Sequence, residues 1–149
     1  MKKDIRYVAT PTGVVEAMLA LAEVGPQDLV FDLGCGDGRL VVAAARRGAR
    51  AVGIDIDPGL ISRSEENARR ANQQERTEFR RENLFHTDLS DATVVLLYLL
   101  HSVNRRLLPK LRRELRPGTR LISHSFDMGD WLADRQITVE SKWVYRWTL

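Results

Sequence analysis

Glycines and carboxylates gather in one short segment, residues 29–57, which has the sequence LVFDLGCGDGRLVVAAARRGARAVGIDID. Gly34, Gly36 and Gly38 follow a short apolar stretch and precede a helical pattern. Glycines at such a junction let the backbone turn sharply and approach a ligand without a Cβ in the way. The segment therefore predicts a loop that binds a nucleotide-type cofactor, with the carboxylate of Asp32 immediately before it.

Two nucleotide-type cofactors compete for this loop. A dinucleotide fold requires G-x-G-x-x-G, in which the third glycine packs the helix on the strand and the pyrophosphate lies at the helix N-terminus. Arg39 stands at that third position, so the dinucleotide pattern fails. The carboxylate of Asp32 would repel a pyrophosphate, but it suits a cofactor that carries an ammonium and a sulfonium. The sequence therefore favours S-adenosylmethionine over a nicotinamide dinucleotide.

Two further positions complete the predicted cofactor site. Asp55, followed by Ile56, ends an expected strand, where its carboxylate can accept hydrogen bonds from both ribose hydroxyls. At the end of the next strand, Asn83 and Leu84 can present an amide side chain and a backbone N–H to an adenine edge. Each assignment has an alternative. Asp55 could cap the following helix, although Asp57 already fills that role, and Asn83 could be an ordinary turn residue.

An alternating order of elements positions these residues. Helical spacing of apolar residues is expected over 12–22, 39–47, 58–72 and around Leu107–Leu115, and strands are expected over 29–33, 50–56, 77–81, 92–100, 119–126, 137–140 and 143–148. Pro109 either kinks the last helix or marks its start. The predicted fold class is α/β: a doubly wound, Rossmann-like fold, mainly parallel, with a C-terminal antiparallel hairpin and a single domain over 1–149.

Composition limits what else the chain can be. It has 149 residues, 44% of them hydrophobic, which is enough for one core. The single cysteine, Cys35, cannot form an internal disulfide, and no Cys/His cluster offers a metal site, so we expect no metal. The start lacks the apolar run of a secretory signal, and residues 94–100 are shorter than the roughly 20 residues of a membrane helix. We expect a cytoplasmic protein without a membrane partner.

The net charge is +3, and much of the positive charge is arginine spread along expected helices, for example Arg46-Arg47, Arg69-Arg70 and Arg112-Arg113. A basic surface can favour nucleic acid or acidic proteins as partners. Solvated helix faces are the simpler interpretation, and we prefer it.

Longer motifs resemble a known family over nearly the whole chain. DLGCGDGR followed by GIDIDP resembles the class I S-adenosylmethionine-dependent methyltransferases. More narrowly, YVATPTGVVEAML, LYLL, LLPKLRRELRPGTRLISHSF and DMGDW are similar to the compact archaeal and bacterial protein-lysine N-methyltransferases and their mitochondrial relatives. Two departures stand out. The adenine-side motif of the family is Asp-Leu, where this chain has Asn83-Leu84, and the mitochondrial relatives carry an N-terminal membrane segment that this sequence does not show.

The resemblance implies a lysine ε-amine as methyl acceptor and therefore a protein partner. Transfer from a sulfonium needs a neutral amine behind the methyl carbon, so positioning and a lowered amine pKa can provide most of the catalysis. Tyr98 is the predicted catalytic residue because it interrupts the apolar run at the end of the fourth strand. Its ring can hold the ammonium and its hydroxyl can orient the amine. The alternative is a tyrosine that reaches the surface from a core strand. His124 is interpreted as a packed or capping residue.

Other residues are placed near the site. Asp127, Asp130 and Trp131 follow the fifth strand and could line a substrate groove. By resemblance, Tyr7 and Thr10 are expected to close over the cofactor.

The absence of two known motifs narrows the range of possible methyl acceptors. The fourth strand lacks the Asn/Asp-Pro-Pro-aromatic motif with which adenine and glutamine amide methyltransferases hold a planar NH2, and no Pro-Cys pair offers a nucleophile for cytosine C5. The predicted function is S-adenosylmethionine-dependent protein-lysine methylation. The alternatives are the same enzyme class acting on RNA or a small amine, and a non-catalytic adenosylmethionine-binding module.

Overall fold

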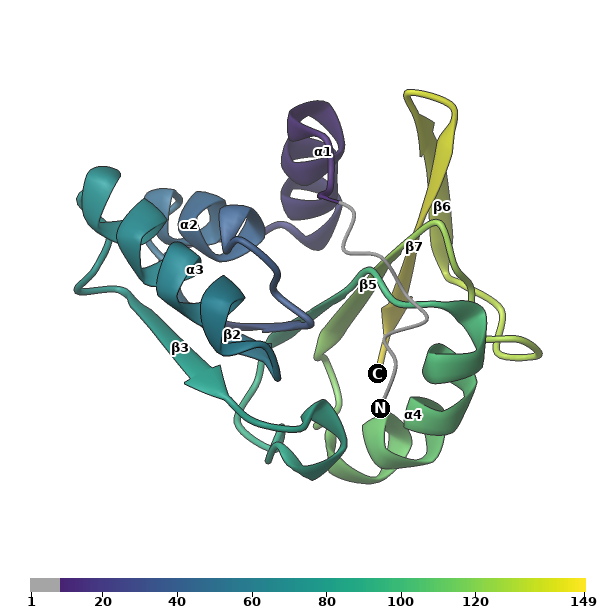
Figure 1. Ribbon diagram of the computed structural model, residues 1–149. Coiled ribbons are helices and arrows are strands. Elements are labelled where there is room, and N and C mark those ends of the chain that lie inside the picture. The colour runs from purple at the N-terminus through teal and green to yellow at the C-terminus, as the bar shows by residue number, and fades with distance from the viewer. Residues whose placement is uncertain (1–8) are drawn as a thin grey trace.

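The computed structural model of the protein describes residues 9–149, whose strands form one mixed sheet (Figure 1). The strands are β1 (Leu29–Leu33), β2 (Arg50–Asp55), β3 (Thr77–Arg81), β4 (Val94–Leu97), β5 (Arg120–His124), β6 (Arg135–Val139) and β7 (Lys142–Thr148). The helices are α1 (Thr12–Ala22), α2 (Arg39–Arg46), α3 (Pro58–Arg70), the 3-10 helix η1 (Leu84–His86) and α4 (His101–Glu114). The strand order is β3-β2-β1-β4-β5-β7-β6, with β1 to β5 parallel and β7 antiparallel to both neighbours. The predicted doubly wound α/β fold with a C-terminal antiparallel hairpin is confirmed.

Helices cover both faces of the sheet. The helices α1, α2 and α3 lie on one face, and α4 lies on the other (Figure 1). In β4, Val94 and Leu96 pack in the cluster with α1 and α2, whereas Val95 and Leu97 pack in the cluster with α4. All four side chains are fully buried, as is typical of a central strand in a parallel sheet.

β4 is shorter than the strand predicted over 92–100. It ends at Leu97, which pairs with Leu33 of β1 and with Ser123 of β5. Leu33 is the last residue of β1, because the glycine loop begins immediately after it. The strand therefore ends level with β1 and one residue before the end of β5, although the apolar run continues through Leu100.

Helix α4 settles the two interpretations of Pro109. The helix begins at His101, has 14 residues and continues through Pro109, so the proline does not mark its start. Pro109 is exposed, and on the solvent side water can bind the carbonyl that loses its helical partner. Across residues 9–149, none of the helices combines the length and apolarity needed to cross a membrane.

The strand order reverses between β1 and β4. The chain runs from β1 outward to β2 and β3 and then crosses back to β4 on the other side of β1. In folds of this kind the ligand crevice lies outside the carboxyl ends of the strands at such a reversal. The loop after β1 and the segment after β4 come close there, since an ideal Cβ on Gly34 would lie 3.0 Å from Cδ2 of Leu99.

Candidate active site

The glycine loop after β1 has the backbone conformation that its sequence predicts. The φ angles of Gly34, Gly36 and Gly38 are +82°, +58° and +83°, a region that side chains disfavour. The amides of Gly34 and Cys35 both donate to the carbonyl of Ile54, at 2.8 and 2.9 Å. The end of β2 therefore anchors the loop, which leads directly into the N-terminus of α2.

Two polar residues of α3 fix the loop from behind, and the sequence reasoning missed both. The Ser64 hydroxyl donates to the Gly36 carbonyl at 2.8 Å, and the Asn67 amide donates to the Asp37 carbonyl at 2.9 Å. Ser64 is fully buried, within the stripe of α3 that also buries Ile61. A hydroxyl in an otherwise apolar helical stripe was the only signal of this contact in the sequence.

Asp55 lies at the carboxyl end of β2 and joins the loop. One carboxylate oxygen accepts from the Gly36 amide at 3.0 Å, and the other accepts from the Asp57 amide at 3.0 Å. Asp57 itself caps α3 through Gly59, as the sequence indicated. A carboxylate has further lone pairs for ribose hydroxyls, and the 58% exposed side chain of Ile56 offers apolar surface beside it. The ribose contact of Asp55 and the ligand contact of Ile56 stay predictions.

Asp32 provides the test of fit for a cationic cofactor. Its side chain is 2% exposed and makes no hydrogen bond or ion pair with any other residue in the 9–149 range. Burial, together with the nearby carboxylates of Asp55 and Asp37, raises the pKa of Asp32 to about 8. A buried carboxylate without a cation is unfavourable, and a bound ammonium or sulfonium removes that penalty. The residues of the loop therefore fit S-adenosylmethionine.

On the adenine side, Asn83 acts as a cap. Its side-chain oxygen accepts from the Phe85 amide at 2.9 Å and starts η1, in which Leu84 is the first residue. Asn83 therefore has the local role expected of an ordinary turn residue. Its side-chain NH2 still provides donors that an adenine nitrogen can accept, so the adenine contact of Asn83 and Leu84 stays a prediction.

Arg39, which stands in place of the third glycine of the dinucleotide pattern, holds the N-terminal side of the site. Arg39 forms an ion pair with Asp37, with 2.6 Å between Nη2 and Oδ2, and its Nη1 donates to the Thr10 carbonyl at 3.0 Å. Thr10 is buried, and its carbonyl binds the residue that directly follows the glycine loop. That Thr10 closes over the cofactor stays a prediction. Tyr7 lies outside the described residues.

Tyr98 follows β4 and belongs to an aromatic stack. Its ring centroid lies 4.0 Å from that of His124, with 28° between the planes, and 6.3 Å from that of Phe126. Tyr98 and Phe126 are half-buried, whereas His124 is 1% exposed. The next residue, Leu99, is the one that approaches Gly34. The predicted catalytic tyrosine is thus a surface-reaching side chain, and it lies at the reversal point beside the glycine loop.

His124 is packed, as the sequence indicated. Neither ring nitrogen has a hydrogen-bond partner. Burial, with a smaller contribution from the charge of Lys142, lowers the pKa of His124 to about 4. The ring is therefore neutral near pH 7 and places no positive charge beside Tyr98.

A buried amide of α4 shapes the segment after β5. The Asn104 side-chain NH2 donates to the carbonyls of Phe126 and Asp127, at 3.1 and 3.3 Å. Asp127 then lies with its Oδ1 3.3 Å from Nδ1 of His101, at the start of α4. Sequence reasoning missed Asn104, because a polar residue between leucines of a helix gives no indication of its partner.

The two other residues predicted to line a substrate groove after β5 differ in their exposure and contacts. Asp130 is exposed, whereas Trp131 lies under the guanidinium of Arg112, at 4.8 Å from its ring centroid. The Trp131 carbonyl accepts from the Trp147 indole at 2.7 Å. A substrate groove along these residues stays a prediction.

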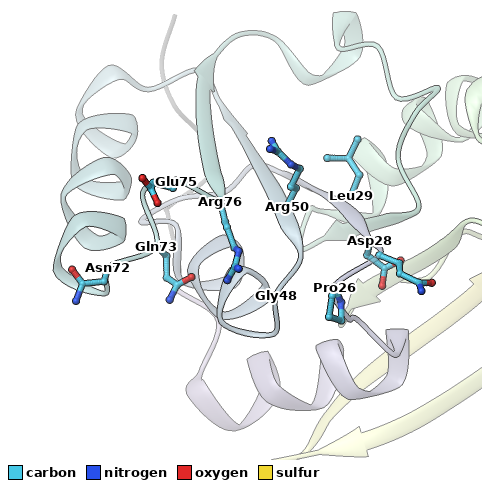
Figure 2. A pocket seen from close by; sticks show the side chains of 10 residues that line it. Pro26, Asp28, Leu29, Gly48, Arg50, Asn72, Gln73, Glu75 and Arg76 are labelled. Carbon is cyan, nitrogen blue, oxygen red and sulfur yellow. The ribbon is translucent and has the colours of Figure 1, made fainter.

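A cavity of about 610 Å³ lies at the amino ends of the strands, opposite the glycine loop (Figure 2). It is lined at the amino ends of the strands by residues such as Asp28, Arg50 and Arg76, with Gly48 and Gln73 nearby. The glycine loop and Tyr98 are at the carboxyl ends, so this cavity is separate from the candidate active site. The chemistry of the side chains locates the site better than cavity volume does.

The comparison with protein families decides between the remaining interpretations. A model of the ANTKMT methyltransferase domain matches residues 32–135. The chain belongs to this methyltransferase family. The methyltransferase is 42% identical to a protein-lysine N-methyltransferase of Saccharolobus islandicus, over 91% of this chain and 86% of that protein. It is 34% identical to the adenine nucleotide translocase lysine N-methyltransferase of Mus musculus, over 88% of this chain but only 57% of that protein.

A solved structure is similar over nearly the full length. The RNA methyltransferase from Salinibacter ruber, in complex with S-adenosylhomocysteine, is 53% identical, with a TM-score of 0.93 and coverage of 95% of this chain and 93% of that one. The methyltransferase is therefore an S-adenosylmethionine-dependent enzyme, and S-adenosylmethionine is its cofactor. The nicotinamide dinucleotide and the non-catalytic binding module are both excluded as interpretations.

Proposed function

We propose that the methyltransferase methylates the ε-amine of lysine side chains in proteins. The observation that carries the proposal is the half-buried ring of Tyr98, stacked with Phe126, whose neighbour in the sequence is Asp127. Aromatic faces attract an ammonium group, and a carboxylate on the same segment adds to that attraction. The relative from S. islandicus, a protein-lysine N-methyltransferase, supports the same acceptor.

The cofactor is held by the residues around the glycine loop. We assign the ammonium of the cofactor to Asp32, its ribose hydroxyls to Asp55 and its adenine to the Asn83-Leu84 segment. S-adenosylmethionine, when bound, supplies a methyl group on a positively charged sulfur. We assign to Thr10, whose buried position is held by Arg39, the role of excluding water from one side of the loop.

The chain's own residues then prepare the amine. The ring of Tyr98 binds the lysine ammonium, and contact with Phe126 removes part of its water, which lowers the pKa of the amine. The amine loses a proton to water at the open rim, and its lone pair forms the N–C bond while the S–C bond breaks. Asp127 stabilises the positive charge that the methylated nitrogen keeps. Correct alignment at short distance provides most of the rate.

RNA is the second candidate acceptor, since the S. ruber relative is an RNA methyltransferase. The strand after which the acceptor binds has no side-chain motif for a planar base amine. Cys35 is buried, and burial raises the pKa of its thiol, so it does not provide the thiolate that cytosine C5 methylation needs.

Transfer of labelled methyl groups separates the two acceptors. Cell extract is incubated with the enzyme and S-adenosylmethionine carrying a labelled methyl group, and the product is divided into samples treated with protease or with ribonuclease. We expect the macromolecular label to be lost with protease and kept with ribonuclease. Label that is lost only with ribonuclease would assign the enzyme to RNA. A parallel reaction with Tyr98→Ala identifies label that depends on the acceptor site.

A further inference from the structure

The solvent-exposed side of α4 is lined with arginines. Between His101 and Gly118 the exposed residues are Ser102, Arg105, Arg106, Pro109, Arg112, Arg113, Arg116, Pro117 and Gly118, and no carboxylate is among them. We call Arg105, Arg106, Arg112 and Arg113, together with Arg116 just beyond the end of the helix, the arginine face of α4. Residues seven apart lie on the same side of a helix, so Arg105 and Arg112 form one row and Arg106 and Arg113 form a second.

Most of these guanidinium groups have no acidic partner within the protein. Arg113 lies 3.7 Å from Glu114, and Arg116 pairs with Asp91 at 2.8 Å. The other three, Arg105, Arg106 and Arg112, form no ion pair with any residue that the structure describes. They are donors without acceptors on an exposed surface, which favours an external anion.

Two of the guanidinium groups are already held in place. Arg106 lies over the ring of Phe85, at 4.6 Å from its centroid, and Arg112 lies over Trp131 at 4.8 Å. A guanidinium on an aromatic face has its N–H edges directed outward and has lost part of its side-chain freedom. Binding a carboxylate there costs less conformational entropy than binding to a free arginine.

The arginine face begins next to the acceptor site. Its helix starts at His101, which lies beside Asp127, and α4 covers the face of the sheet opposite α1, α2 and α3 (Figure 1). At 1.5 Å per residue, Arg105 lies about 6 Å and Arg112 about 16 Å along the helix from His101. A protein that presents a lysine at Tyr98 can therefore contact the arginine face with the same surface.

We propose that the arginine face of α4 binds an acidic surface of the protein substrate while the substrate lysine enters beside Tyr98. This inference rests on the proposed lysine methylation and adds the chemistry of the partner. The surface has two signs of charge: Asp127 and Asp130 are negative at the acceptor end, and the arginines are positive along α4. A protein with a lysine and neighbouring acidic residues complements both parts.

An RNA partner fits the same surface less well. A polyanion that follows the arginines to the acceptor end meets the negative charges of Asp127 and Asp130. Single-stranded RNA also gains affinity by stacking bases on exposed aromatic rings. One face of each of the rings of Phe85 and Trp131 is covered by Arg106 and Arg112, which reduces the aromatic surface open to a stacked base.

A matched pair of charge reversals tests the surface. The test variant is Arg105→Glu/Arg112→Glu, and the control is Arg50→Glu/Arg76→Glu, which makes the same change in net charge at the amino ends of the strands. All four arginines are exposed and form no ion pair with described residues. Calorimetric titration with S-adenosylhomocysteine checks that each variant is folded and binds cofactor as the wild type does.

Two fluorescent probes report binding without any methyl transfer: a peptide with one lysine followed by a run of glutamates, and an oligouridylate. We expect the wild type to bind the peptide more tightly than the oligouridylate. The test variant should bind the peptide at least about tenfold more weakly, and the control should bind it as the wild type does. Equal weakening in both variants, or no weakening in the test variant, would overturn the proposal, as would tighter binding of the oligouridylate. Because these assays need no turnover, their outcome is separate from that of the labelling experiment on the acceptor.

Discussion

The cofactor half and the acceptor half of the site lie on either side of the boundary between β1 and β4, and they are built differently. In the cofactor half, backbone groups make most of the contacts: the Gly34 amide binds the Ile54 carbonyl, and the Gly36 amide binds Asp55. In the acceptor half, side chains from the ends of β4 and β5 stack on one another around Tyr98. The glycine pattern that shapes the first half is local in sequence, although its anchors at Ile54 and Asp55 are not. The second half is built from side-chain contacts between separate strands.

The two halves also differ in how many of their buried polar atoms have hydrogen-bond partners. The described residues bury five side-chain polar atoms without hydrogen-bond partners, and four of these belong to Asn104, His124 and Ser125 in the acceptor half. Ser125 also has a φ of +71°, which is unfavourable for a residue with a side chain. Unpaired buried polar groups and backbone strain reduce stability and tend to occur where function requires them. These features gather in the acceptor half, whereas the counterpart in the cofactor half is the buried carboxylate of Asp32.

The largest predicted effect concerns the backbone of the cofactor half. An alanine at Gly38 adds a side chain at a φ of +83° and a Cβ only 2.9 Å from the Cβ and Oγ of Ser64. Strain of about 1–3 kcal/mol and displacement of Ser64 should weaken binding of S-adenosylhomocysteine about 100-fold, as measured by calorimetry. Gly118→Ala is the control, since Gly118 has a φ of +92° and nothing within 4 Å of its ideal Cβ. That control should lower thermal stability and leave affinity unchanged. Normal affinity in Gly38→Ala would show that the loop is not the cofactor site.

Asp32→Asn tests the charge of the same half. Removing the carboxylate should weaken cofactor binding by about 1–3 kcal/mol, because a charged hydrogen-bond acceptor is lost. The pKa of about 8 means that the carboxyl is protonated in the free enzyme near pH 6.5 and releases its proton when a cation binds. Calorimetry in buffers of different ionisation enthalpy should show proton release in the wild type and none in Asp32→Asn. Equal proton release in both proteins would exclude Asp32 from the site.

The stability of the free enzyme should follow the same group. The folded pKa of Asp32 is raised above its ordinary value of 3.8, so between about pH 4 and pH 8 the folded state binds more protons than the unfolded state. The free energy of unfolding contributed by Asp32 is therefore fully present below pH 4 and is lost as pH rises toward 8. Asp32→Asn should flatten this part of the profile in denaturant titrations, and an unchanged slope would contradict the assignment.

Tyr98 tests the acceptor half. Tyr98→Ala removes a cation–π contact of about 2 kcal/mol, so kcat/KM for the acceptor protein should fall about 30-fold while affinity for S-adenosylhomocysteine stays the same. Tyr98→Phe keeps the ring and removes the hydroxyl. Full activity in Tyr98→Phe would eliminate the orienting role of the hydroxyl and keep the role of the ring. Full activity in Tyr98→Ala would remove Tyr98 from the mechanism.

The smallest effect is expected at the support of the loop. Ser64→Ala deletes the hydrogen bond to the Gly36 carbonyl, worth about 1 kcal/mol, and should weaken binding of S-adenosylhomocysteine about fivefold. Ser90→Ala, in an exposed turn, serves as the control and should leave affinity unchanged. Equal affinities for the two variants would show that α3 does not position the loop.

The same comparison explains what the sequence could and could not predict. The glycine loop, the role of Asp57 as a cap and the first three strands depend on local patterns, and each was found at or within a residue or two of its predicted position. The end of β4 was placed too late, because it is set by the neighbouring strands and not by the apolar run. The hydrogen bonds of Ser64 and Asn104 and the stacking of Tyr98 on His124 join residues far apart in the chain, and no local pattern encodes such partners.

The most direct test of the central claim is to identify the methylated atom. Acceptor proteins labelled by the wild-type enzyme are digested and sequenced by mass spectrometry, with Tyr98→Ala as the reference for labelling that does not depend on the site. We predict methyl groups on lysine ε-nitrogens of proteins, reduced in the reactions with Tyr98→Ala. Methyl groups found on nucleotides or on another side chain would contradict the account, as would lysine methylation at equal levels with both enzymes.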